Sequence, residues 1–198
     1  MVRVVAASVL IFTGAMIQAH AGPLHDAARA GDVQKVRELA RQGTGMDAPG
    51  ENGETPLILA ILERHGDVAE LLIEQGADVS ARNAGGFAPL HAAAYVGDAD
   101  AAEALLAAGA AVDDRDNKAG VSPLSVAAEE GHPAVARVLI ERGADVEITE
   151  QNGYTPLTRA LWRGHQDVVA VLQQAGAKCQ PVEILEEPAF SECMAGQR

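Results

Sequence analysis

The chain has 198 residues, of which 48% are hydrophobic and 22% charged but only 3% aromatic, and its formal net charge is −13. This charge repels phosphate backbones, which argues against a nucleic-acid partner; it favours either simple solubility or encounter with a cationic protein. With so few aromatic rings, Ala and Leu must fill the core, which suits thin layers of closely packed helices.

Residues 1–21 differ from everything that follows. Arg3 is their only charge, residues 4–17 are nearly all apolar or small, and Ala19 and Ala21 stand three residues and one residue before a cleavage point. This pattern predicts a secretory signal peptide. The alternative is a membrane anchor, but the apolar run is shorter than the ~20 residues that span a bilayer. We therefore expect a periplasmic or secreted mature chain that does not insert into a membrane.

Pro-Leu pairs recur through the remaining chain at steps of 33, 33, 34 and 33 residues, and a Gly follows each Pro about twenty residues later. The pairs begin at Pro23, Pro56, Pro89, Pro123 and Pro156, and the glycines are Gly43, Gly76, Gly109, Gly143 and Gly176. A fixed period of this length indicates a solenoid of stacked units, none of which can bury its apolar face alone.

The last repeat shows how one unit is built. Thr155 suits the cap of a helix that starts at Pro156, and Gly164 suits its end. A second helix is predicted over about 166–174, with valines and a leucine on its apolar face and Gly176 after it. Links rich in Gly, Asn and Asp join successive units and suit tight hairpin turns.

This order of helix, turn, helix and hairpin, opened by Thr-Pro-Leu-His, resembles the ankyrin repeat. Residues 22–28 and 88–94 come closest to the family motif, and the resemblance extends over residues 22–178. It implies an all-α repeat solenoid of five helix-turn-helix units joined by short β-hairpin loops, with the units at 22–54, 55–87, 88–121, 122–154 and 155–178. The fold hosts many binding roles, so it implies a protein partner without identifying it.

Two departures from the repeat stand out. Arg64 occupies the position where the other first helices end in Gly, so we expect a strained or rearranged turn there. One residue is inserted within 113–121, which predicts a longer and more mobile hairpin between the third and fourth units.

Both cysteines of the chain, Cys179 and Cys193, lie close to the C-terminus. In an exported chain they are expected to form one structural disulfide that closes the tail, residues 179–198. A metal pair or a redox-active pair is the alternative, but two thiols are too few ligands for a zinc site and no Cys-x-x-Cys is present. The tail is expected to fold back over the last unit, with apolar cover from Val182, Ile184, Leu185 and Phe190.

The resemblance implies that hairpin tips and first helices line a concave binding face. Four aromatic residues fall at such positions, and they would form two pads, Phe87 with Tyr95 and Tyr154 with Trp162. Trp and Tyr are enriched in binding hot spots, although local packing of these rings is the alternative.

Four further residues complete the predicted binding face. Val121 at a hairpin tip, Glu129 and Glu130 lie between the two aromatic pads, and Arg163 follows Trp162. Apolar anchors on either side of an acidic strip would suit a protein partner with apolar groups and a basic patch, and they would not enclose a small substrate.

The sequence carries no recognisable catalytic, phosphate-binding or metal-binding motif, so we expect neither an enzyme nor a cofactor. Its histidines occupy the Pro-Leu-His and turn positions of the repeat, where the resemblance implies structural hydrogen bonds. The leading hypothesis is therefore an exported, monomeric protein that inhibits another protein, as an immunity protein does, or assists a periplasmic stress enzyme. The alternative is an envelope scaffold that assembles with itself through its ends.

Overall fold

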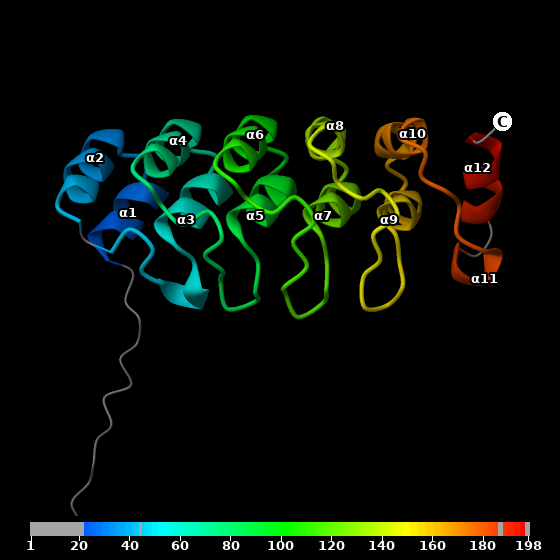
Figure 1. The fold of residues 1–198 in the computed structure, drawn as a ribbon, viewed down its shortest axis with the longest axis horizontal. Helices are drawn as coiled ribbons and strands as arrows, with labels where there is room; N and C mark the ends of the chain where they lie inside the picture. The colour runs from blue at the N-terminus through cyan, green and yellow to red at the C-terminus, as the bar shows by residue number, and fades with distance from the viewer. Residues whose placement is uncertain (1–21, 44, 186–187, 197–198) are drawn as a thin grey trace, which may run out of the picture.

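The computed structural model describes residues 22–43, 45–185 and 188–196. The predicted signal peptide therefore lies outside the described residues. Within them, five helix pairs stack side by side (Figure 1). The pairs are α1 (Pro23–Arg29) with α2 (Val33–Arg41), α3 (Pro56–Leu62) with α4 (Gly66–Glu74), α5 (Pro89–Val96) with α6 (Ala99–Ala107), α7 (Pro123–Glu130) with α8 (Pro133–Glu141), and α9 (Pro156–Arg163) with α10 (Gln166–Gln174).

The expected all-α repeat solenoid is confirmed. The first helices of the pairs form one row and the second helices form another, and the connecting loops project beyond the first row (Figure 1). A short 3-10 helix, η1 (Glu51–Gly53), lies in the first of these loops. Among the described residues we find no helix whose length and hydropathy would let it cross a bilayer.

The connecting loops have the course of hairpins but contain no strand within the described ranges. Single hydrogen bonds close three of them, for example from the Asn83 amide to the Phe87 carbonyl at 3.1 Å. Successive loops are tied together in the same way, as by the Ala84 amide and the Asn52 carbonyl at 2.7 Å. The loops therefore turn as hairpins do but form no β-strands in the described residues, because one closing bond is not a ladder.

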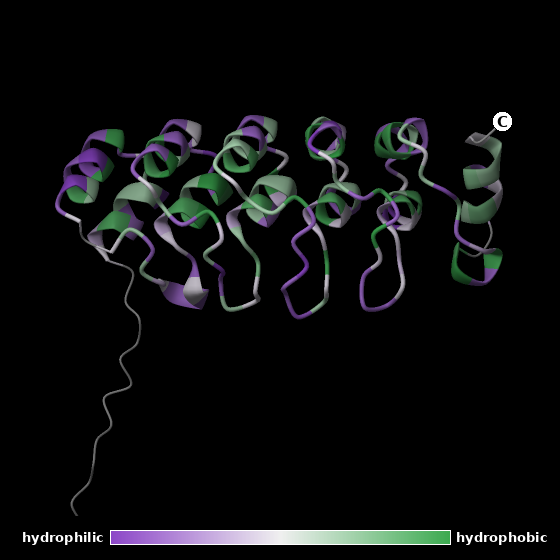
Figure 2. Ribbon diagram, in the orientation of Figure 1, coloured by the Kyte–Doolittle hydropathy of each residue, from purple (hydrophilic) through white to green (hydrophobic). Residues whose placement is uncertain are grey.

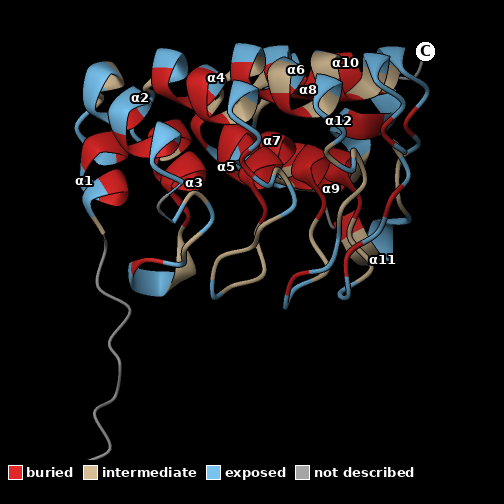
Figure 3. Ribbon diagram, turned by 60° about the vertical axis from the view of Figure 1, so that its left-hand side comes forward, coloured by how far each residue is buried: buried red, intermediate tan, exposed pale blue. Residues whose placement is uncertain are grey.

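The core is made mainly of Leu and Ala at fixed repeat positions. The Leu after each motif Pro is at most 3% exposed, and an Ala three residues later is also buried in every unit. The leucines are Leu24, Leu57, Leu90, Leu124 and Leu157, and the alanines are Ala27, Ala60, Ala93, Ala127 and Ala160. Small side chains let neighbouring helices approach closely. The buried and hydrophobic residues lie mainly where the two rows of helices face each other (Figures 2 and 3).

Two kinds of residue begin the first helices. Thr55, Ser122 and Thr155 each accept a hydrogen bond from a backbone amide three residues on. Units one and three lack such a hydroxyl; there His25 and His91 accept, through Nδ1, from the amides of Gly22 and Ala88 at 3.1 and 3.3 Å. Both solutions satisfy a backbone donor that would otherwise be left unpaired.

Histidines also join neighbouring units at the turns between their helices. His65, His132 and His165 donate through Nε2 to the carbonyls of Arg29, Tyr95 and Glu129 of the preceding unit, at 3.0–3.1 Å. Each ring lies against the turn glycine of that unit, namely Gly31, Gly97 or Gly131. These glycines have positive φ, and a Cβ on any of them would lie only 2.5–2.6 Å from the imidazole Nδ1.

The turn at Arg64 is strained and not rearranged, because a residue with a side chain keeps the backbone conformation of the other turns. Arg64 adopts a left-handed φ of 60°, as the glycines at this repeat position do. Its guanidinium donates to the carbonyl of Val96 in the following unit. The following unit has Asp98 where units two, four and five have His, and Asp98 caps α6 by accepting from the Ala101 amide at 2.9 Å.

The C-terminal cap, residues 179–185 and 188–196, covers the end of the fifth unit. It contains α11 (Val182–Leu185) and α12 (Ala189–Gly196), and the sulfur atoms of Cys179 and Cys193 are joined at 2.07 Å. Of the four residues expected to provide apolar cover, Leu185 is buried, Ile184 and Phe190 are half-buried, and Val182 remains 38% exposed.

Polar contacts hold the C-terminal cap against the fifth unit. Gln173 Nε2 donates to the Cys193 carbonyl at 3.0 Å. Gln180 accepts from the amide and the hydroxyl that begin α9, those of Thr155 and Thr158, and donates to the Gly153 carbonyl at 2.8 Å.

Candidate functional site

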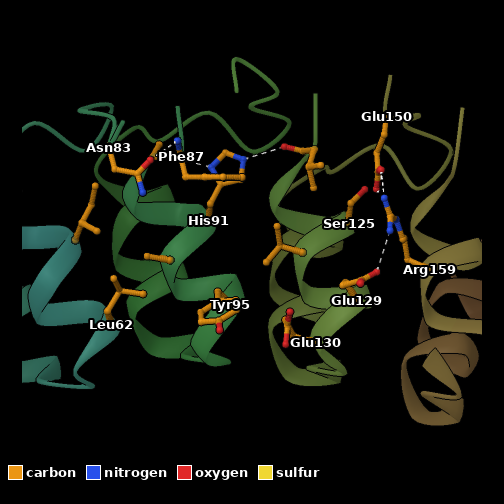
Figure 4. Close-up of a pocket in the computed structure, with 15 residues that line it drawn as sticks. Leu62, Asn83, Phe87, His91, Tyr95, Ser125, Glu129, Glu130, Glu150 and Arg159 are labelled. Carbon is orange, nitrogen blue, oxygen red and sulfur yellow. Dashed lines mark hydrogen bonds and ion pairs between the residues drawn. The ribbon is translucent and has the colours of Figure 1, made fainter. Parts of the chain in front are cut away.

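A groove of about 430 Å³ crosses the row of first helices from α3 to α9 (Figure 4). Ile58 and Leu62 of α3 line one side and Arg159 of α9 lines the other, and Ala92 of α5 is among the lining residues between them. Ala92 stands at the repeat position where the fifth unit carries Arg159, so the third unit fills less space there.

The end of the groove nearest the loops is held by Phe87, His91 and Asn83. The Asn83 side chain accepts from the amides of Gly85 and Phe87 at 2.9 and 3.0 Å, which fixes the loop. The Phe87 ring stands edge-on to the His91 ring with centroids 5.4 Å apart. Phe87 is thus half-buried and packs against His91, not against Tyr95 as expected; Figure 4 shows Phe87 and Tyr95 at opposite ends of α5.

His91 is a structural residue by its bonding. Its Nδ1 accepts from the Ala88 amide, so Nε2 carries the proton and donates to the carbonyls of Val121 and Asp114 at 3.0 and 3.1 Å. Burial lowers the pKa of the ring below its ordinary value, although the carbonyl of Val121 and the carboxylate of Asp114 oppose this. A neutral ring with both nitrogens bonded has no free position for acid–base catalysis.

An ion-pair network occupies the other end of the groove. Arg159 binds the carboxylate of Glu150 through two nitrogens, with Nε 2.9 Å from Oε1, and its Nη1 lies 3.3 Å from Glu129. Arg163 also binds Glu129, with its Nε at 2.8 Å. Hydrogen bonding to Glu150 is the main cause that raises the pKa of Arg159, with burial acting against it. Arg159 therefore remains positively charged.

Because of this network, only one of the two glutamates in the predicted acidic strip lacks an ion pair within the described residues. Two guanidinium groups bond the Glu129 carboxylate, whereas Glu130 is exposed and makes no ion pair or hydrogen bond to a described residue. Sequence reasoning missed Arg159 and Glu150. The signal was present, because Arg159 stands where units two to four carry Leu59, Ala92 and Val126. A charge at an otherwise apolar repeat position requires a partner.

The second predicted aromatic pad exists but lies outside the groove. The rings of Tyr154 and Trp162 meet edge to face with centroids 4.6 Å apart, and the Arg159 guanidinium lies 5.4 Å from the Tyr154 centroid. Trp162 is 42% exposed, and its Nε1 donates to the Leu185 carbonyl of the C-terminal cap at 3.0 Å. This pair therefore contributes to the junction between α9 and the cap.

The structure thus divides the eight predicted binding residues into two sets. Five of them line the groove: Phe87, Tyr95, Val121, Glu129 and Glu130. The other three, Tyr154, Trp162 and Arg163, do not. Tyr95 is the most exposed large apolar side chain of the described residues, at 56%. In the same part of the chain, no group of three or more His, Cys, Asp or Glu side chains is placed to hold a metal ion.

Comparison with known protein families gives a match over most of the chain. A family model described as ankyrin repeats (3 copies) matches residues 9–83 and 90–182, and a second one, described as ankyrin repeats (many copies), matches residues 63–106. The first match begins within the predicted signal peptide. A comparison with curated proteins finds no match.

Proposed function

Because the chain belongs to the ankyrin-repeat family, whose repeats are non-enzymatic protein–protein interaction modules, we propose that its groove binds one protein partner. The observation that carries the proposal is Tyr95, more than half exposed at the edge of an open and largely apolar groove. An exposed aromatic side chain beside an apolar depression is typical of the centre of an interface.

The bonding within the groove favours a binding role over catalysis. The His91 nitrogens, the Glu150 carboxylate and the Arg159 guanidinium are all engaged by other groups of the protein. Groups that are hydrogen-bonded or ion-paired with one another hold the surface rigid. A rigid surface loses little conformational entropy when a partner binds. They are not available to activate a substrate.

We further propose that the protein acts outside the cytoplasm as an inhibitor, in the manner of an immunity protein, or as a helper of a periplasmic enzyme. The composition of residues 1–21 supports export, and the pairing of Cys179 with Cys193 suits an oxidising compartment. The net charge of −13 supports a partner with a basic patch. The C-terminal cap supports a monomer, because it covers the end through which units would stack in a self-assembling scaffold.

The test is affinity capture from an envelope extract with the wild-type protein, Tyr95→Ala and Met194→Ala. Met194 is 41% exposed on the C-terminal cap and does not line the groove, so it is the matched control. We expect one protein to be retained by wild type and Met194→Ala but lost from Tyr95→Ala. Retention that is equal on all three would contradict binding in the groove.

The captured protein then distinguishes the two roles. The purified pair is assayed for complex stoichiometry and for the activity of the partner with and without this chain. Loss of activity in a 1:1 complex would identify an inhibitor, and a gain of activity would identify a helper.

A further inference from the structure

Most polar groups that line the groove already have partners. Asn83, His91, Ser125, Glu129, Glu150 and Arg159 all make hydrogen bonds or ion pairs within the protein. The exceptions among the described residues are the Tyr95 hydroxyl and the Glu130 carboxylate, which make neither a hydrogen bond nor an ion pair. These are the groups that a partner has to satisfy.

The two exceptions belong to neighbouring helices. Tyr95 lies near the end of α5 and Glu130 is the last residue of α7, and Figure 4 shows both at the end of the groove away from the loops. α5 and α7 pack directly against each other. The aromatic ring and the free carboxylate therefore border the same corner of the groove.

The pairing of Glu129 explains why Glu130 stays free. Consecutive residues on a helix point in different directions, so the guanidinium groups that bond Glu129 do not also bond Glu130. Arg163 lies near enough to Glu130 to interact with it electrostatically, but its guanidinium bonds Glu129. Only one of the two predicted acidic residues is thus available for recognition.

Resting on the proposed function, we propose that the partner contributes a Lys or Arg that lies between the Tyr95 ring and the Glu130 carboxylate, with an adjacent apolar side chain in the groove. A cation at this corner gains an ion pair and a cation–π contact together. An acidic or wholly apolar segment would instead remove water from Glu130 without compensation.

The apolar side chain follows from the rest of the lining. Leu62, Ala92 and Val126 present carbon surface next to the charged corner. The groove, at about 430 Å³, is near the lower end of the ~300–1,000 Å³ range of ligand pockets. It therefore fits a short segment with a basic and an apolar residue side by side, and the net charge of −13 favours encounter with such a segment.

The experiment is selection of a displayed random-peptide library on the immobilised full-length protein with its disulfide intact. Wild type is compared with Tyr95→Ala, Glu130→Gln and Glu130→Lys. Glu141→Gln is the matched control, because Glu141 is an exposed glutamate at the end of α8 and does not line the groove. Circular dichroism of each variant checks that it is folded.

We expect wild type and Glu141→Gln to enrich peptides with Lys or Arg next to an apolar residue. Synthetic versions of these peptides should bind Glu130→Gln about fivefold more weakly and Tyr95→Ala about tenfold more weakly. Glu130→Lys should enrich Asp or Glu in place of the basic residue.

Two other outcomes would overturn the inference, and they differ in what they mean for the proposed function. Peptides that require Tyr95 but show no basic preference, or bind Glu130→Gln as tightly as wild type, would leave groove binding intact and refute the cation site. Peptides that bind all variants equally would refute both.

Discussion

The junctions between neighbouring units are of two kinds. Between units one and two, three and four, and four and five, a turn glycine lies against a histidine of the next unit, and that histidine donates back to a carbonyl. Between units two and three, Arg64 replaces the glycine, Asp98 replaces the histidine, and Arg64 donates forward to Val96.

The difference shows that the residue at the turn of one unit and the residue that faces it from the next unit depend on each other. The imidazole occupies the space that a Cβ would fill on the preceding turn residue, so any residue other than glycine there excludes the histidine. With the histidine absent, the guanidinium of Arg64 supplies a bond between the two units in the opposite direction. The junction keeps an inter-unit hydrogen bond although the glycine and the histidine of the usual junction are both replaced.

The largest effect is expected for Gly131→Ala at a regular junction. The new Cβ would lie 2.6 Å from His165 Nδ1 on a residue with φ of 78°. Backbone strain and overpacking together should lower the free energy of unfolding by about 3–4 kcal/mol. Gly164→Ala is the control, because φ is 75° there and no neighbour lies within 4 Å. Urea denaturation should show a loss of only about 1 kcal/mol for it; equal losses would mean that the histidine contact is unimportant.

The second-largest loss of stability is expected when the disulfide is removed from the junction at the end of the stack. The fifth unit has no following histidine, and hydrogen bonds of Trp162, Gln173 and Gln180 join it to the C-terminal cap. Opening the bond between Cys179 and Cys193 should lower stability by about 3 kcal/mol in the chain-entropy model. Thermal melting with and without a reductant measures this; an unchanged midpoint would show that the cap does not depend on the bond.

A smaller effect should appear when the irregular junction is rebuilt. Asp98→His alone places a ring against the Cβ of Arg64 and removes the cap of α6, so it should destabilise the protein by about 2 kcal/mol. In combination with Arg64→Gly, part of this loss should be recovered, with a coupling free energy of about 1–2 kcal/mol in a double-mutant cycle. Additive effects of the two changes would contradict the proposed dependence.

The smallest effect concerns the pH dependence of stability, and it tests His91 of α5, which does not belong to the turn junctions. Because burial lowers the pKa of His91, the unfolded chain binds a proton at higher pH than the folded protein does. The contribution of His91 is fully present above about pH 6.5 and declines as the pH falls below that value. Asp78 and Asp114 also have lowered pKa values, but they affect stability only as the pH falls through 3.8.

Urea denaturation at about pH 7.5 and pH 5.5 measures this contribution. His91→Gln should be less stable than wild type at the higher pH because a buried ring and its hydrogen bonds are lost. Its stability should also change less between the two pH values than that of wild type. The same change in both proteins would show that His91 does not titrate on unfolding.

Much of the fold could be read from the repeat period because the information is local or involves adjacent units. The Pro that starts each first helix, the hydroxyl that caps it and the glycine that ends it all act within a few residues. The unusual turn was also predictable, since Arg64 interrupts a periodic glycine and indeed adopts a positive φ. Tyr95 and Glu130 were identified because both stand near the end of a first helix, on the face that the family resemblance assigns to binding.

The binding surface itself required the tertiary structure. Which carboxylate is free was decided by two arginines from the next unit, 30 and 34 residues away from Glu129. Phe87 packs on His91 and Trp162 bonds the C-terminal cap because of directions that side chains take across unit boundaries. By itself the sequence determined a stack of five units and the residues that point out of it, because a repeat specifies backbone geometry. Only the tertiary structure decided which of these residues bond to one another and which remain available to a partner. Such bonds depend on where side chains from different units meet.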